Sequence, residues 1–321
     1  MIPMELPIEI KTQIESLAGR YSTCELKEAS KHISDIYLNS ERNSSPLLNS
    51  VLDVVTYAVV RMPATYASIS HVLEHSLSLY KSEINTLLDV GSGTGAATIA
   101  VSNYLNHHLE ITCLEKESSM VTFAKELFAN YPLLKGTKWI NEDFSYLKNN
   151  YKADLVIASY ALNELKKDDL LPIVERLYNA SNKLLVIIEP GTVKGYEEMT
   201  TIREHLIKLG GHIIAPCPHM NKCPLTNDWC HFSTRLSRSK LHKLLKGGDA
   251  PYEDEKFTYL IISKDDNFTK VNNRILRHPY NGNGYIGLNL CTDSGLKDIK
   301  VTKKEKEKYK LVKKLSVGDN F

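Results

Sequence analysis

The chain has 321 residues, of which 42% are hydrophobic and 24% are charged. This length is too great for a disulfide mini-protein and is sufficient for one large domain or two ordinary ones, while the composition excludes disordered and collagen-like chains. The net charge of +2 is unevenly distributed: residues 1–196 carry 18 Lys and Arg against 23 Asp and Glu (net −5), and residues 197–321 carry 22 against 15 (net +7). We therefore expect any basic partner surface in the C-terminal part.

The first 20 residues contain Glu5, Glu9 and Glu15 and no long apolar run. This pattern is unlike a signal peptide or an acid-poor transit peptide. No stretch of the sequence approaches the roughly 20 apolar residues of a membrane span. We therefore expect a cytoplasmic protein with reduced thiols and no membrane partner, and we regard a mitochondrial matrix location as the less favoured alternative.

Residues 4–83 have apolar positions that recur three and four residues apart, which is typical of helices. Pro63 interrupts this pattern and is expected to end or kink a helix. Residues 1–85 are therefore predicted to form an N-terminal helical module.

From residue 86 the pattern changes to short apolar strands that alternate with amphipathic helices, which predicts a doubly wound, Rossmann-like α/β sheet. The expected strands begin with TLLDV at 86–90 and end with HIIAP at 212–216 and KFTYLIISK at 256–264. We assign residues 86–265 to this core, with a cysteine-rich insertion at 216–250 between its last two strands. Residues 266–321 are predicted to form a small basic C-terminal module.

A glycine-rich loop, Asp89-Val90-Gly91-Ser92-Gly93-Thr94-Gly95, lies where the first predicted strand turns into the first helix of the core. Glycine allows the backbone to approach a ligand closely, and the following helix N-terminus offers free N–H groups. A P-loop is excluded because no Gly-Lys-Ser/Thr follows. The dinucleotide fingerprint remains open as an alternative, because it tolerates alanine at the position of Ala96.

Acidic residues at later strand ends favour S-adenosylmethionine over NAD at this loop. Glu115 ends the second strand, where a carboxylate can bind both ribose hydroxyls, and Asp143 ends the third, where an adenine amino group could be recognised. Together with the loop, this pattern resembles class I S-adenosylmethionine-dependent methyltransferases. The predicted cofactor-binding residues are Asp89, Gly91, Ser92, Gly93, Gly95, Glu115, Asp143 and Asn163. No catalytic residue is predicted, because no motif for a methyl acceptor is recognisable.

Three cysteines, Cys217, Cys223 and Cys230, lie within 14 residues, and Cys291 is a plausible distant fourth. Structural zinc usually takes its cysteines in closely spaced pairs, and no such pair occurs here. The wider spacings, and the prolines that follow two of these cysteines, favour a [4Fe-4S] cluster. Two alternatives stay open: a zinc site that uses His219 or His231 in place of Cys291, and reduced buried thiols without a metal.

Two basic segments accompany the cysteines. Residues 231–246 carry five Lys and Arg and no acidic residue, and residues 297–314 carry nine lysines and three acidic residues. With aromatic residues nearby, these segments favour an RNA-binding surface over a merely solvated face.

Four motifs together resemble the methyltransferase-like family associated with the mitochondrial small ribosomal subunit and its bacterial relatives. They are R-M-P-A-T-Y, L-D-V-G-S-G-T-G, P-C-P-H-(x)3-C-P-L-(x)4-W-C-H-F-(x)2-R-(x)2-R and L-C-T-D-S-G. The resemblance implies a class I methyltransferase fold, a [4Fe-4S] cluster on Cys217, Cys223, Cys230 and Cys291, and action on small-subunit ribosomal RNA. The family usually has Trp-Gly-Asp near its C-terminus, where this chain has Val317-Gly318-Asp319.

This resemblance leads us to expect a bacterial-type cytoplasmic member that binds the small ribosomal subunit and is monomeric when free of it. Two functions are compatible with it, an S-adenosylmethionine-dependent rRNA methyltransferase and a non-catalytic ribosome assembly factor on the same fold. An NAD-dependent oxidoreductase with a zinc site is the third alternative.

Overall fold

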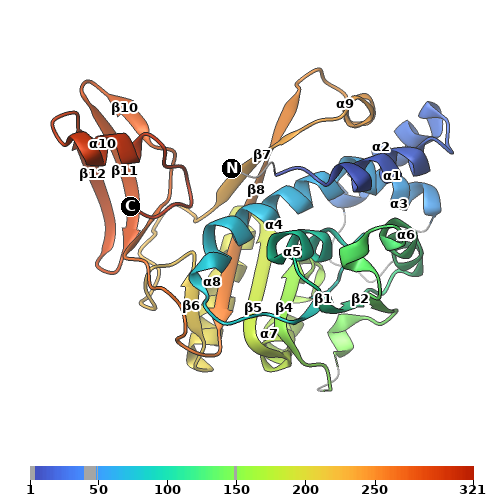
Figure 1. Cartoon of the computed structure of the whole chain (residues 1–321), viewed down its shortest axis with the longest axis horizontal. Helices are drawn as coiled ribbons and strands as arrows, with labels where there is room; N and C mark the ends of the chain where they lie inside the picture. Colours follow the sequence, from blue (N-terminus) through green and yellow to red (C-terminus); the bar gives the residue numbers. More distant parts are fainter. Residues whose placement is uncertain (1–3, 40–47, 49, 148–149) are drawn as a thin grey trace.

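The computed structural model describes residues 4–39, 48, 50–147 and 150–321 (Figure 1). Ten α-helices are assigned in this part of the chain: α1 (Ile8–Ala18), α2 (Thr23–Asn39), α3 (Val51–Val60), α4 (Met62–Ser76), α5 (Ala96–Leu105), α6 (Ser118–Phe128), α7 (Lys167–Ala180), α8 (Val193–Lys208), α9 (Lys240–Lys246) and α10 (Lys306–Val312). The strands of the main sheet are β1 (Thr86–Val90), β2 (Glu110–Leu114), β3 (Lys138–Ile140), β4 (Ala153–Ser159), β5 (Ser181–Pro190), β6 (His212–Ala215), β7 (Phe232–Ser237) and β8 (Tyr252–Ser263).

The main sheet has the strand order β3-β2-β1-β4-β5-β8-β6, and β7 pairs with the outer part of β8. Strands β1 to β5 are parallel, whereas β8 lies antiparallel between β5 and β6. The predicted doubly wound α/β sheet is therefore confirmed. The antiparallel strand is the feature that the strand pattern alone did not indicate, because pairing direction depends on the path of the connection and not on local composition.

Helices cover both faces of this sheet. One hydrophobic core lies between the sheet and helices α4, α5 and α6, and it includes Leu87; the other lies between the sheet and helices α7 and α8, and it includes Leu88. Successive residues of a strand point to opposite faces. Both Leu87 and Leu88 are buried, which explains the continuous apolar strands of the sequence.

The N-terminal residues form the helices that the periodicity predicts. Helix α3 begins at a capping residue, since the Ser50 side chain accepts a hydrogen bond from the Asp53 N–H. The predicted break at Pro63 falls between α3 and α4, and the proline occupies the first turn of α4, where its missing N–H is not needed. Helix α4 packs against α5 and also against β7 and β8, so the N-terminal helices join the main core.

The insertion between β6 and β8 is more ordered than a loop. After the cis bond between Ala215 and Pro216, an irregular segment carries three of the cysteines, and strand β7 and helix α9 follow. The indole N–H of Trp229 donates to the Gly191 carbonyl oxygen at 3.0 Å, which ties this segment to the end of β5. Helix α9 is capped by Ser239 and reaches α2 and α3.

The C-terminal residues form a separate small antiparallel sheet with its own core (Figure 1). Its strands are β9 (Asn273–Ile275), β10 (Tyr280–Gly282), β11 (Tyr285–Thr292) and β12 (Gly295–Thr302), and α10 packs on it. The chain then returns to the main body, where Val317 joins the main core and Gly318 lies against His71 of α4. Val317 is thus a buried residue of the main core.

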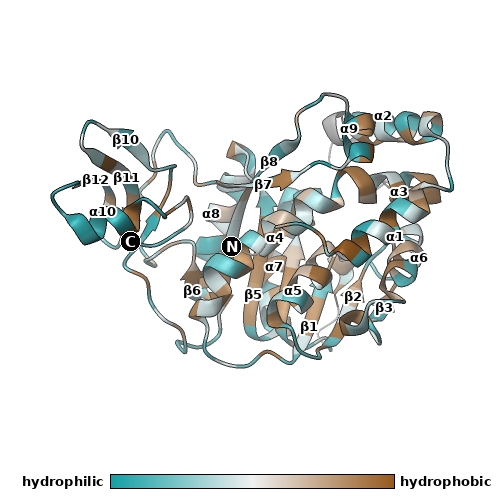
Figure 2. Ribbon diagram, turned by 45° about the horizontal axis from the view of Figure 1, so that its top comes forward, coloured by the Kyte–Doolittle hydropathy of each residue, from teal (hydrophilic) through white to brown (hydrophobic). Residues whose placement is uncertain are grey.

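Hydropathy follows this architecture. The strands of the main sheet are apolar, whereas α10 and much of the C-terminal sheet are hydrophilic on their outer side (Figure 2). No helix within the described ranges has the length and apolar character needed to cross a membrane.

Candidate functional site

The glycine loop lies at the carboxyl end of β1, between β2 and β4. Gly91, Gly93 and Gly95 all have positive φ values, of 65°, 54° and 84°. A Cβ on Gly91 would lie 2.7 Å from the Cβ of Ala161, and one on Gly95 would lie 2.4 Å from the Phe128 ring. A Cβ on Gly93 would meet nothing within 4 Å, so Gly93 faces open space at the expected cofactor position.

Asp89 lies near the end of β1, and its side chain points into the protein. Its Oδ2 accepts hydrogen bonds from the Thr98 N–H at 3.1 Å and the Thr98 hydroxyl at 2.6 Å, and the residue is fully buried. Burial raises the pKa of Asp89 to about 7, although the two bonds from Thr98 oppose this rise. Asp89 therefore ties β1 to the first turn of α5 and shapes the loop from behind.

Glu115 holds the glycine loop directly. Its Oε2 accepts the Gly93 N–H at 2.7 Å and its Oε1 accepts the Glu117 N–H at 2.8 Å. Burial raises the pKa of Glu115, while these two backbone bonds oppose the rise. Ser92 is also turned inward, since its hydroxyl donates to the Leu114 carbonyl oxygen. Glu115 and the loop thus form one connected unit at the ends of β1 and β2.

The remaining predicted cofactor residues lie at the ends of β3 and β4. Asp143 caps the short turn after β3 by accepting the Ser145 N–H at 2.8 Å. The Asn163 Oδ1 after β4 and the Glu189 Oε2 at the end of β5 are buried atoms without a hydrogen-bond partner. Burial raises the pKa of Glu189 to about 8, so this carboxyl is largely protonated at neutral pH. Unused polar atoms at this edge are suited to a polar ligand.

Lys116, which was not among the predicted residues, pairs with Glu164 at the same edge of the sheet. Its Nζ lies 3.1 Å from the Glu164 Oε2, so the pair joins the residues after β2 and β4, the two neighbours of β1. Both side chains are about one-third exposed. No local signal in the sequence brings these two residues together, because they are 48 positions apart.

The four predicted cysteine ligands line one small pocket. Cys217, Cys223 and Cys230 come from the insertion and Cys291 from β11, and together they surround a cavity of about 40 Å³. Such a volume exceeds the roughly 10–15 Å³ that one water requires. Residues of α8 and β8 complete the wall, so the pocket lies where the main sheet, the insertion and the C-terminal sheet meet.

The surroundings of three thiols in this pocket, those of Cys217, Cys230 and Cys291, favour the protonated form. Burial, reinforced by the neighbouring sulfurs, raises the pKa of Cys291 to about 12 and that of Cys230 well above its ordinary value. Burial also raises the pKa of Cys217, against an opposing influence of Arg203. The Tyr196 hydroxyl donates to the Cys223 sulfur at 3.3 Å.

The two histidines considered as alternative ligands do not line the pocket. The His219 Nε2 lies 3.5 Å from the Cys291 sulfur, and the His231 ring stacks on Trp229 while its Nδ1 faces the Trp229 carbonyl oxygen. In the described part of the chain, no group of three or more His, Cys, Asp or Glu side chains is arranged to hold a single metal ion.

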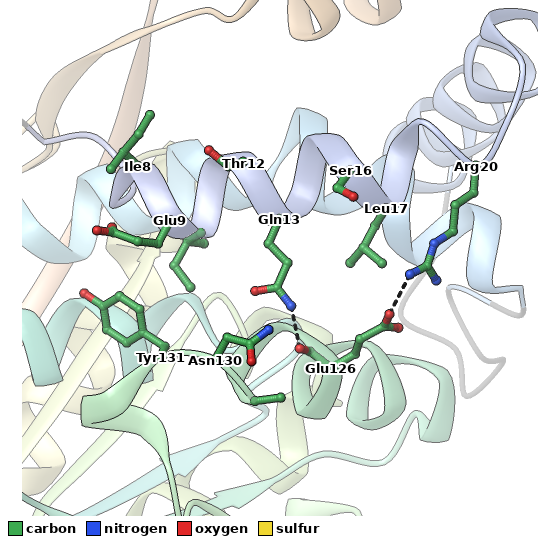
Figure 3. Close-up of a pocket in the computed structure, with 12 residues that line it drawn as sticks. Ile8, Glu9, Thr12, Gln13, Ser16, Leu17, Arg20, Glu126, Asn130 and Tyr131 are labelled. Atoms are coloured by element: carbon green, nitrogen blue, oxygen red, sulfur yellow. Dashed lines mark hydrogen bonds and ion pairs between the residues drawn. The ribbon is translucent and has the colours of Figure 1, made fainter.

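Another pocket lies away from these residues. It occupies about 710 Å³ between α1 and the end of α6, where Gln13 donates to the Glu126 carbonyl oxygen and Arg20 pairs with the Glu126 carboxylate (Figure 3). It contains none of the residues predicted from the glycine loop or the cysteines.

The two basic segments differ in their surroundings. In the insertion, Arg235 pairs with Asp254 and Lys246 pairs with Glu253, both on the adjacent strand β8, and Arg238 donates to backbone carbonyls. In contrast, all nine lysines of residues 297–314 are exposed. Lys300 also lies over the Tyr285 ring, 4.9 Å from its centroid. Of the two basic segments, residues 297–314 therefore present the larger exposed positive surface.

The main sheet has five parallel strands, β1 to β5, and the antiparallel strand β8 lies between β5 and β6. This strand order, together with the glycine loop at the end of β1, defines a class I methyltransferase fold. Within this class, the chain belongs to the family described as mitochondrial small ribosomal subunit Rsm22, whose model matches residues 51–321. The predicted family is thereby confirmed.

Individual relatives are distant in sequence. The chain is 24% identical over 264 residues to the human "Ribosome assembly protein METTL17, mitochondrial". This alignment covers 75% of this chain and 56% of the relative. The chain is 25% identical over 325 residues to "Rsm22-cox11 tandem protein 2, mitochondrial" of Schizosaccharomyces pombe, covering 84% and 43%. The chain thus spans about half the length of the curated relatives that it matches.

Among solved structures, the chain is similar to the magnesium protoporphyrin IX methyltransferase of Synechocystis PCC 6803, whose crystal structure contains bound SAM. The TM-score is 0.41 and the identity 12%, with 74% of this chain and 97% of that chain covered. The fold assignment itself rests on the strand order and on the pairing directions given above.

The predicted bacterial-type cytoplasmic location is wrong by this comparison, because the curated relatives are named as mitochondrial proteins and the family description is mitochondrial too. The prediction relied on acidic residues near the N-terminus. Glu9 and Glu15 are exposed residues of helix α1, so their presence reflects a folded amphipathic helix and carries no information on targeting.

Proposed function

We propose that this chain is a mitochondrial assembly protein of the small ribosomal subunit, which binds ribosomal RNA through its C-terminal module and is monomeric off the ribosome. The observation that carries the proposal is the match of residues 51–321 to the small-subunit family, a range that includes the nine exposed lysines of residues 297–314. The human relative named a ribosome assembly protein supports the same role. The proposal includes the division of the chain into an N-terminal helical module (residues 1–85), a methyltransferase core (residues 86–265) and a C-terminal module (residues 266–321).

We further propose that the glycine loop binds S-adenosylmethionine. The open space at Gly93 and the buried unpartnered atoms of Asn163 and Glu189 support a polar ligand at this edge of the sheet. Gly93 and Glu115 would lie nearest to it, with Asp143 at its far end and Asp89 and Ser92 holding the loop from behind. When bound, this cofactor supplies an activated methyl group.

A [4Fe-4S] cluster on Cys217, Cys223, Cys230 and Cys291 is the third part of the proposal. A single zinc ion needs its sulfurs about 2.3 Å from one centre, whereas each thiolate of a cluster binds a different iron. The four thiols line one small cavity, and the absence of a closely spaced cysteine pair in the sequence favours the cluster over zinc. Because the ligands come from the insertion and from β11, the cluster would fasten the C-terminal module to the methyltransferase core.

The partner is tested by cross-linking in mitochondria from cells that carry a tagged form of this chain. We expect cross-links to small-subunit rRNA in immature particles, and depletion should reduce the mature small subunit but not the large one. Recovery of cross-links only to other RNA, or equal loss of both subunits, would contradict the proposal.

Methyl transfer to ribosomal RNA is a second candidate function, favoured by the retained glycine loop and by Glu115. Calorimetry with S-adenosylmethionine and incubation of immature subunits with labelled cofactor separate the two functions. Binding with incorporation of label supports the enzyme, and binding without incorporation supports the assembly protein alone. Absence of binding by metal-loaded protein would exclude both the enzyme and the proposed cofactor.

A further inference from the structure

Two buried arginines flank the four-cysteine pocket, and neither was recognised in the sequence. Arg203 lies on α8 and Arg274 on β9, and their exposed fractions are 4% and 1%. Both side chains line the pocket together with the cysteines. Their sequence positions gave no sign of this, since Arg203 falls in a charged amphipathic helix and Arg274 in a basic tail.

Both arginines donate hydrogen bonds to backbone carbonyl oxygens. Arg203 donates from Nη2 to the carbonyl oxygens of His219 and Asn221, at 2.9 and 2.8 Å. Arg274 donates from Nε to the Pro216 carbonyl oxygen at 3.0 Å and from Nη1 to that of Gly318 at 2.6 Å. Among the residues that the structure describes, no carboxylate lies within ion-pair distance of either guanidinium.

Each guanidinium also retains an unused N–H group. The Arg203 Nε and the Arg274 Nη2 are buried atoms without a hydrogen-bond partner. An arginine cannot lose its charge in a protein, and a buried charge is costly unless an opposite charge and hydrogen bonds compensate it. Two such buried cations beside one pocket therefore call for an opposite charge within it.

We propose that Arg203 and Arg274 are the counter-charges of a tetrathiolate metal centre, which they stabilise by neutralising its net charge of −2. This inference rests on the proposed metal site. Four thiolates contribute −4 and a [4Fe-4S] core in its oxidised resting state contributes +2, so that the two guanidinium groups bring the buried site to neutrality. The same sum holds for one zinc ion on four thiolates, so the inference concerns the thiolates and not the identity of the metal.

The hydrogen bonds from the two arginines to backbone carbonyl oxygens hold the guanidinium groups at the pocket. Arg203 holds the backbone on both sides of Met220 in the insertion, and Arg274 joins the backbone before Cys217 to the C-terminal residue Gly318. The same side chains therefore position the cysteine segment and place positive charge beside the sulfurs. If the arginines act by charge, lysine should partly replace them, whereas if they act only by holding the backbone, lysine should be no better than glutamine.

The test uses full-length protein purified without oxygen and compares Arg203→Gln, Arg274→Gln, Arg203→Lys and Arg274→Lys with the unchanged chain. Iron, sulfide and zinc content, the absorbance near ~400 nm, the rate of iron loss to a chelator and the midpoint potential of the cluster are measured. Arg235→Gln is the matched control, because Arg235 is an exposed arginine of the same insertion that is paired with Asp254 and does not line the pocket.

We expect the glutamine variants to lose iron roughly tenfold faster, as for outer-shell substitutions at other metal sites, and to have a more negative midpoint potential. The potential falls because reduction adds negative charge to a site that has lost a positive one. The lysine variants keep the charge but not the paired carbonyl bonds, so they should restore much of the potential. Arg235→Gln should match the unchanged chain.

The possible results separate a failure of the inference from a failure of the proposed cluster. A loaded wild-type protein whose potential and iron-loss rate are unchanged in both glutamine variants overturns the inference and leaves the cluster intact. Lysine variants that behave like the glutamine variants also overturn it, because the role is then structural. Wild-type protein with one zinc and no iron overturns the cluster, and the zinc-release rates of the same variants then decide the inference. Protein that holds neither metal overturns both.

Discussion

Gly91 and Gly93 have similar backbone angles but different surroundings, so the same substitution should have different effects at the two positions. Gly91→Ala adds a clash with Ala161 to the strain of a positive φ, and we expect it to lower the free energy of unfolding by about 2–4 kcal/mol. Gly93→Ala meets open space, so its cost should be only about 1 kcal/mol. Urea denaturation measures both values.

Among the molecules that are folded, Gly93→Ala should weaken ligand binding more than Gly91→Ala does, which is the reverse of their order in stability. The methyl group at position 93 would project toward the expected cofactor and should weaken S-adenosylmethionine binding in calorimetry, while the stability of the protein is nearly retained. Equal losses of stability at positions 91 and 93 would contradict the geometry of the loop described above.

Asp89 makes stability depend on pH. Its folded pKa of about 7 lies above the ordinary value of 3.8, so between about pH 4 and 7 the folded chain holds a proton that the unfolded chain has lost. The free energy of unfolding should therefore fall as the pH rises through this window, by at most about 1.4 kcal/mol per pH unit from this residue. Asp89→Asn should remove that contribution.

The measurement is denaturation at several pH values between 5 and 7. Glu189, with its pKa of about 8, contributes a similar slope that remains in the variant, so the difference between the two slopes reports Asp89 alone. Glu307→Gln, at an exposed position, is the control and should leave the slope unchanged. Parallel curves for Asp89→Asn and the unchanged chain would show that Asp89 is not protonated in the fold.

At the scale of elements, the C-terminal residues act as a strap between the small sheet and helix α4. Asp319 accepts the Ser316 N–H, its carbonyl oxygen accepts the Ile275 N–H, and its carboxylate lies 3.3 Å from the His75 Nε2. Burial lowers the pKa of His75, but the bond to Asp319 and neighbouring charges outweigh it, so the pKa is raised overall. The pKa of Asp319 is lowered by the same contact, although burial opposes this.

The pair should therefore stabilise the fold most between about pH 4 and 6.5. Below this window Asp319 becomes protonated, and above it the contribution disappears as the pH passes the raised pKa of His75. Asp319→Asn should cost about 0.5–1 kcal/mol at pH 6 and clearly less at pH 9, because both side chains are partly exposed. Thermal unfolding at the two pH values measures this, with the exposed Asp266→Asn as control. A cost that does not vary with pH would refute the ion pair.

For the whole molecule, the C-terminal module is the expected RNA surface. Replacing the exposed Lys303, Lys304 and Lys308 by Gln should weaken binding to small-subunit rRNA at all sequences alike. The slope of log K against log salt should decrease by up to about 2–3, which corresponds to roughly 0.7–0.9 for each phosphate contact. Filter binding or fluorescence titration at several salt concentrations measures it.

Two sets of lysines on other surfaces serve as comparisons. Lys125, Lys135 and Lys138 are also exposed but lie in the core, on α6 and at or just before β3, and should be replaceable with little effect. The insertion lysines Lys240, Lys243 and Lys246 should have a smaller effect than the C-terminal set, because Lys246 is already paired with Glu253. A larger effect of the insertion set would place the RNA surface there instead.

Much of the fold was predictable because it is encoded locally. The apolar strands, the amphipathic helices and the break at Pro63 were recognised from the periodicity of the sequence. The loop after β1 was recognised from its glycines, which its positive φ values require. Strand β7 and helix α9 were missed, since both are short, β7 is stabilised by pairing with β8, and the partners of α9, which are α2 and α3, are distant in the chain.

The sequence by itself determined the class of the fold, the family and the set of four cysteines, because these depend on local periodicity and on short motifs. Only the tertiary structure decided the direction of β8, the inward turn of Asp89, the pairing of the basic insertion and the convergence of Arg203 and Arg274 on the cysteine pocket. The physical reason is that burial and partnership of a charged side chain are set by residues far away in the chain, which no local pattern records.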